Sequence, residues 1–212
     1  MSTQTRITEF ARTTVTDAPL TSSPRPPYPE TAADRGRQAR TRVWFDTGIA
    51  DALEYIAHER SCNVAEYGDR DRQNHLIGVA GELASATWRG GRFDTRIFDD
   101  FEGDDGVDVE VPRSGDTDPW RLQVKTTRDM ENPEHVVDRS VLETVDEVVL
   151  CCTKAPREFV EIVGYIPSDH LSQREDKYGD DGPAVRPNNV LPVPTPEQHY
   201  FPPDVREFHK TR

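Results

Sequence analysis

The sequence predicts an α/β (α+β) domain, because the period of its apolar residues changes from helical to strand-like along the chain. Between residues 46 and 88, apolar residues recur at intervals of three and four, which is typical of helices with one buried face. After residue 94, apolar and polar residues alternate in short runs, which is typical of half-buried strands. The 212 residues are enough for one ordinary domain and its tails.

Two helices are predicted before the strands. Asp46 has the side chain of an N-cap, and an apolar face runs from Ile49 to Ala57 in the helix that follows it. The second helix is predicted over about Arg72 to Trp88. The pair Gly90-Gly91 is expected to end it, since glycine favours helix C-termini.

Strands are predicted where the alternation is strongest, and a short helix is expected to start at Ser168. The strand candidates are Thr95–Phe98, Val107–Val111, Trp120–Thr127, Glu147–Thr153 and Glu158–Ile166. The loop from Pro112 to Pro119 is polar, so the strands on either side of it are expected to pair as a hairpin.

The expected hairpin gathers polar side chains on one face. If Val111 pairs with Trp120, then Asp108 lies opposite Gln123. A register slip by two residues keeps the same faces and would place Asp108 beside Arg121 or Lys125. Packing of the alternating apolar residues therefore brings an aspartate, an amide and a lysine together.

The two ends of the chain differ from its middle. Residues 1–42 are expected to form a disordered tail, because they are rich in threonine, serine, proline and arginine. The domain is predicted over residues 43–212. Within it, the charged and then proline-rich stretch near 173–198 is expected to be a long irregular connection.

Charge and composition indicate an acidic surface and the compartment expected for the protein. The net charge is −13, and four of the 26 basic residues are lysines, a bias that resembles the acidic surfaces of salt-in halophiles. A lysine inside a motif is therefore more informative here than usual.

No apolar run is long enough for a membrane span and no secretory signal is visible, so a cytoplasmic protein is expected. Three cysteines, two of them adjacent, do not form a disulfide framework.

The polar face has the groups that phosphodiester hydrolysis requires. Mg²⁺ (or Mn²⁺) prefers oxygen ligands, which the Asp108 carboxylate and the Gln123 carbonyl could supply. Lys125 could orient the attacking water and offset charge on the phosphate. Glu82 is a further candidate, because its neighbours one helical turn away are small and would allow a close approach to the sheet.

These residues resemble a known superfamily. Asp105-Gly106-Val107-Asp108 followed by Leu122-Gln123-Val124-Lys125 is similar to the glutamine-containing variant of the PD-(D/E)XK signature in Mrr-type restriction endonucleases. The helix with Glu82 resembles the glutamate-bearing first helix of many members. Over roughly Arg72 to Leu171, the resemblance implies a restriction-endonuclease-like α-β-β-β-α-β core, with a central mixed β-sheet flanked by helices. It also implies a Mg²⁺-dependent deoxyribonuclease, with the backbone carbonyl of Val124 as a further metal ligand.

Two other interpretations stay open at this point. Gln123 replaces the more usual acid, so the chain could be a nucleic-acid-binding or accessory module on the same fold without catalysis. Asp108, Gln123 and Lys125 could also be an ordinary polar sheet face. Glu110 shares the face of Asp108, and a surface role is favoured for it over metal binding.

DNA is the expected partner, and two further contacts are considered. The tail segment from Gln4 to Phe10 resembles the peptide that docks on sliding clamps, a mode suited to a segment that folds on binding. Arginines of the tail could instead contact phosphates without sequence preference. Because nucleases that cut both strands often act in pairs, a homodimer is one expected arrangement.

Overall fold

The computed structural model describes most of the chain between residues 40 and 193. The described residues are 40–62, 69–93, 106–113, 118–177, 182–191 and 193, without the side chains of 62 and 69–71. The clamp-like segment Gln4–Phe10 and the predicted strand Thr95–Phe98 lie outside these residues. None of the helices that the structure describes combines the length and the apolar character needed to cross a membrane.

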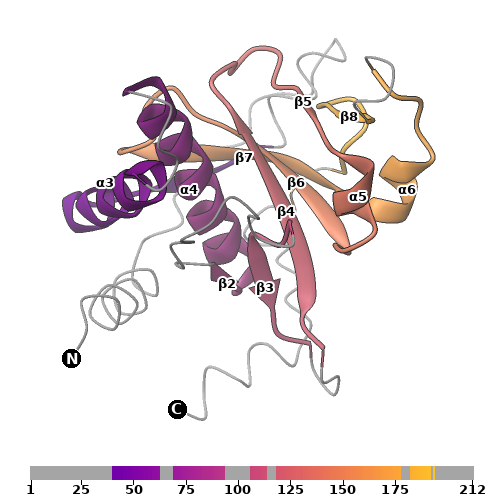
Figure 1. Ribbon diagram of the computed structural model, residues 1–212, viewed down its shortest axis with the longest axis horizontal. Helices are drawn as coiled ribbons and strands as arrows, with labels where there is room; N and C mark the ends of the chain where they lie inside the picture. Colours follow the sequence, from indigo (N-terminus) through magenta and orange to yellow (C-terminus); the bar gives the residue numbers. More distant parts are fainter. Residues whose placement is uncertain are drawn as a thin grey trace, which may run out of the picture.

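A mixed six-stranded sheet forms the centre of the protein, with the order β1-β7-β6-β4-β3-β2 (Figure 1). Strands β4 and β6 are parallel, and the other neighbouring pairs are antiparallel. The strands are β1 (Thr41–Trp44), β2 (Arg92–Phe93), β3 (Val109–Val111), β4 (Trp120–Thr127), β6 (Glu147–Cys152) and β7 (Phe159–Pro167). The predicted α+β class with a mixed sheet is therefore confirmed.

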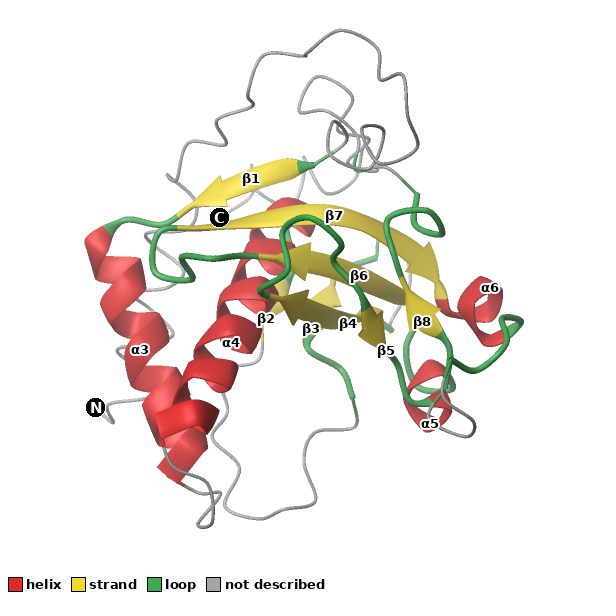
Figure 2. Cartoon of the chain, turned by 90° about the horizontal axis from the view of Figure 1, so that it is seen from above, coloured by secondary structure: helices red, strands yellow, loops and turns green. Residues whose placement is uncertain are grey.

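Helices pack against both faces of this sheet. Helices α3 (Thr47–Cys62) and α4 (Asp69–Arg89) share one apolar cluster with the sheet. The short helices α5 (Arg139–Leu142) and α6 (Ser168–Ser172) share a second cluster with its other face. Figure 2 shows the two pairs of helices well separated across the strands. Strand β6 is buried along its whole length, because it contributes residues to both clusters.

Two parts of the fold differ from the expectation. The folded part begins two residues before the expected boundary at 43, since β1 starts at Thr41 and pairs with β7 at the sheet edge. The stretch near 173–198 is not wholly irregular. It contains β8 (Ala184–Val185), which pairs with β5 (His135–Val136) in a separate two-stranded sheet.

The expected helix ends are present. The backbone N–H of Ile49 donates to Oδ1 of Asp46 at 2.8 Å, as an N-cap requires. At the other end of the helical pair, Gly90 has a φ of 67° and the N–H of Gly91 donates to the carbonyl of Ala86 at 2.8 Å. A left-handed glycine followed by this bond is the usual way to satisfy the last carbonyls of a helix.

Helix α4 approaches β4 closely at one glycine. A Cβ atom on Gly81 would overlap the Oγ1 atom of Thr126 and would lie 3.0 Å from the Cβ atom of the same threonine. The Thr126 hydroxyl is buried and lacks a hydrogen-bond partner among the described residues. The absence of a side chain at position 81 therefore sets how closely Glu82, the next residue, lies to the strand.

We expect Gly81→Ala to destabilise the protein by about 1–3 kcal/mol, because the added methyl group must push α4 away from β4. Gly78→Ala is the matched control in the same helix, since its Cβ would meet no atom closer than Glu82 Oε1 at 3.9 Å. That control is expected to be neutral or to stabilise the protein by up to about 1 kcal/mol. Urea denaturation of both variants measures the difference, and equal stabilities would contradict the close packing.

Candidate active site

Every residue predicted for the site lines one pocket of about 1060 Å³ between α4 and the ends of β3 and β4. Glu82 comes from α4, Asp108 precedes β3, and Gln123, Val124 and Lys125 lie in β4. The other lining residues are Asn74, Ile77, Gly78, Thr126, Thr127, Arg128, Asp129, Asn132, Glu134, His135, Val136 and Lys177. The structure therefore brings together predicted site residues that are up to 43 positions apart in the sequence, from Glu82 to Lys125.

The hairpin has the register in which Asp108 faces Gln123. Val111 pairs with Trp120 and Val109 with Leu122, and the N–H of Asp108 donates to the carbonyl of Leu122 at 2.9 Å. Leu122 and Val109 point into the apolar cluster beneath α4, so their chain neighbours Gln123 and Asp108 point to the opposite face. The first of the registers considered from the sequence is thus confirmed.

Asp108 and Gln123 are in direct contact. The amide nitrogen of Gln123 donates to Oδ2 of Asp108, and the backbone N–H of Val124 donates to the same oxygen at 2.5 Å. Asp108 is 8% exposed and Gln123 is 5% exposed. The carboxylate therefore has a structural role as well, because it satisfies a backbone donor of β4 at the point where β3 has not yet begun.

Glu82 is held by an arginine from the neighbouring helix. Nη1 of Arg60, in the last turn of α3, lies 3.1 Å and 3.0 Å from the two carboxylate oxygens of Glu82. Both side chains are largely buried. Arg60 could not be identified from the sequence, since no local pattern links two residues 22 positions apart.

Lys125 lies on the same side of β4 as Gln123 and is half-buried at the pocket. A second lysine, Lys177, reaches the same pocket from the segment after α6 and forms an ion pair with Glu134. The scarcity of lysine that singled out Lys125 applied equally to Lys177. Its place in the pocket could not be read from the sequence, because it follows from the packing of a distant segment.

Glu110 does not join the site. Its side chain is exposed, it pairs with Arg121 in β4 and Arg92 in β2, and it is not among the described residues that line the pocket. The surface role favoured for Glu110 agrees with this position.

The donor set suits a hard divalent cation. The described residues contain no group of three or more His, Cys, Asp or Glu side chains close enough to hold a metal. Mg²⁺, however, commonly takes one or two carboxylates and completes its shell with water and phosphate oxygens. Asp108 and Glu82 supply two carboxylates at one pocket, and the Gln123 amide could supply a neutral oxygen by turning over. The residues present are therefore compatible with Mg²⁺ or Mn²⁺.

The adjacent cysteines are structural. Cys151 and Cys152 are fully buried in β6 and have free thiols. Burial raises the pKa of both thiols to about 12, so neither is ionised near neutral pH. This agrees with their interpretation as small strand residues in reduced form.

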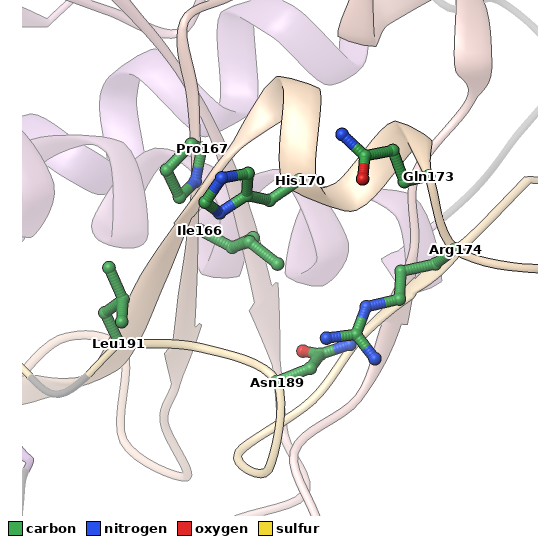
Figure 3. Close-up of a pocket in the computed structure, with 7 residues that line it drawn as sticks. All are labelled: Ile166, Pro167, His170, Gln173, Arg174, Asn189 and Leu191. Carbon is green, nitrogen blue, oxygen red and sulfur yellow. The ribbon is translucent and has the colours of Figure 1, made fainter.

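A second pocket lies beside α6 and has a different character. It has a volume of about 520 Å³, and Figure 3 shows the seven side chains around it. They include the apolar Ile166 and Leu191 and the basic Arg174, but no carboxylate. The lining side chains of this pocket offer no acidic oxygen to a metal, so the pocket at β4 is the better candidate for phosphodiester chemistry.

Comparisons with protein-family models, with curated proteins and with solved structures found no match for this chain.

Proposed function

We propose that the chain is a Mg²⁺-dependent deoxyribonuclease with a restriction-endonuclease-like core. The observation that carries this proposal is the convergence of Glu82, Asp108, Gln123 and Lys125 on one pocket. The order α4-β2-β3-β4, then α5, then β6 parallel to β4 also supports it, because this is the α-β-β-β-α-β order that the resemblance implies.

The site residues divide into cation ligands and one lysine in the proposed reaction. Asp108 and Glu82 would hold the cation, together with the Gln123 side chain and the Val124 carbonyl. A bound Mg²⁺ supplies charge that polarises the phosphate and makes water more acidic. The Lys125 ammonium donates hydrogen bonds that orient the attacking water and offset the negative charge that develops on the phosphate oxygens.

The direct test uses the purified full chain on duplex, single-stranded and branched DNA, with Mg²⁺ or Mn²⁺ and at low and high salt. Cleavage that EDTA removes is the expected result. A folded protein that binds DNA but cleaves none of these substrates under any condition would contradict the proposal.

That outcome would instead support a nucleic-acid-binding module without catalysis. The observation that favours this second function is the contact between Gln123 and Asp108, in which the amide nitrogen and not its oxygen faces the carboxylate. The net charge of −13 also opposes DNA binding at low salt.

We expect Gln123→Glu to bind Mg²⁺ about tenfold more tightly, because it adds a second carboxylate in contact with Asp108. Without metal, the two like charges should lower the free energy of unfolding by about 1–3 kcal/mol at pH 8. Thermal denaturation with increasing Mg²⁺ measures both effects. Gln173→Glu is the control, since it adds the same charge at an exposed position outside the pocket. Equal Mg²⁺ responses of the two variants would argue against a cation site at Gln123.

A further inference from the structure

The ion pair between α3 and α4 places a fixed positive charge beside the proposed metal site. A single nitrogen, Nη1 of Arg60, lies against both oxygens of Glu82 at 3.1 Å and 3.0 Å. The exposed fractions of the two side chains are 14% and 10%. Burial of a single charge at this depth would be unfavourable. The contact between the two side chains offsets that loss of hydration, so neither is expected to leave the other. Glu82 is therefore oriented by α3 although it belongs to α4.

The pair changes the charge that a cation would meet. Asp108 and Glu82 are the two acids of the proposed cation site, and Gln123 is neutral. Lys125 and Arg60 supply two positive charges close to these acids. The cluster formed by Glu82, Asp108, Lys125 and Arg60 is therefore formally neutral. A divalent cation gains less electrostatic energy from a neutral cluster than from one with a net negative charge.

We propose that Arg60 is a positioning residue of this site, which orients the Glu82 carboxylate towards the pocket and lowers its attraction for the metal. This inference rests on the proposed function. The inference gives helix α3 a role in the reaction, although α3 lies outside the core formed by α4 to β6. Arg60 itself does not line the pocket in the described residues, so it acts through Glu82 and not on the substrate.

The test is Mn²⁺ binding by the full chain without DNA, followed by the electron paramagnetic resonance signal of unbound Mn²⁺. Arg60→Gln is expected to bind Mn²⁺ about fivefold to tenfold more tightly than wild type, because a nearby positive charge is lost. It should also cleave DNA about tenfold more slowly at saturating metal, since Glu82 is no longer held. Arg60→Lys should stay within about twofold of the wild-type Mn²⁺ affinity, because one ammonium can replace the single nitrogen of the contact.

Arg157→Gln is the matched control. Arg157 forms ion pairs with Asp51 and Glu54 of the same helix α3, but on the exposed surface. Its removal is expected to leave both Mn²⁺ affinity and cleavage unchanged. If Arg60→Gln binds Mn²⁺ no more tightly than Arg157→Gln, the role of Arg60 is contradicted while the nuclease proposal stands. If the folded wild-type chain binds no Mn²⁺ at all, the proposed metal site fails as well.

A second pair of variants serves if Arg60→Gln does not fold with Glu82 left unpaired. Glu82→Gln alone should bind Mn²⁺ about fivefold to tenfold more weakly than wild type, because the charge of Arg60 is no longer offset. The double variant Arg60→Gln/Glu82→Gln removes both charges and should return to within about threefold of wild type. A double variant as weak as Glu82→Gln would overturn the proposal.

Discussion

Replacement of Lys125 by alanine is expected to reduce metal-dependent DNA cleavage by at least about 100-fold. The Lys125 ammonium lies in the same pocket as Asp108 and Glu82, and in the proposed reaction it offsets charge that develops on the phosphate. The side chain is half-buried and is not part of either apolar cluster, so the free energy of unfolding should change by less than about 1 kcal/mol. Single-turnover cleavage at saturating Mg²⁺ and urea denaturation measure the two quantities.

Lys154→Ala is the matched control for this variant. It removes the same charge from an exposed lysine. Lys154 is not one of the described residues that line the pocket. We expect wild-type cleavage from it, with DNA binding within about threefold. Undiminished cleavage by Lys125→Ala would remove the residue from the proposed mechanism, and an equal loss in both variants would point to nonspecific electrostatics.

The hairpin could be predicted from the sequence in detail because alternation has a period of two. Strand β4 spans Trp120–Thr127, as predicted, and Val111 pairs with Trp120 in the register considered first. A slip by one residue would have turned the buried Leu122 outward and Gln123 inward, which the packing of the sheet opposes. The shared face of Asp108, Gln123 and Lys125 follows from that constraint.

Other parts of the fold could not be predicted from the sequence, because their apolar residues show no local periodicity. Strands β5 and β8 have two residues each, too few for any alternation to be visible. Strand β1 begins inside the stretch whose composition predicted disorder, and it pairs with β7, more than 110 positions later. Tertiary pairing of this kind overrides local propensity.

The same limit applies to the site. Glu82 could be proposed because the residues one helical turn away are small, and the structure adds a close contact between Gly81, the residue beside it, and Thr126. Arg60 and Lys177 could not, since each reaches the site through the packing of a separate element. Sequence patterns identified residues on one element or one hairpin, whereas contacts between elements required the structure.

Asp108→Asn is expected to have the second large effect, with loss of at least about 100-fold in both Mg²⁺ affinity and cleavage. The substitution removes the negative charge but keeps an oxygen that can accept the hydrogen bond of the Val124 N–H. The Gln123 amide nitrogen donates to the same oxygen, so an asparagine oxygen in that place can accept this hydrogen bond as well. Because both hydrogen bonds can be kept, the free energy of unfolding should fall by no more than about 2 kcal/mol.

Glu110→Gln separates this effect from the loss of any carboxylate on the same strand. Glu110 is two residues from Asp108 on the same side of the hairpin, but its side chain is exposed, and the residue lies opposite Arg121 in the strand register. We expect its amide variant to bind Mg²⁺ and cleave DNA like wild type, as measured by calorimetric Mg²⁺ titration and single-turnover kinetics. Similar losses in both variants would mean that the charge of the strand, and not the position of Asp108 in the pocket, attracts the cation. A loss confined to Asp108→Asn would locate the metal at the point where the Asp108 carboxylate meets β4.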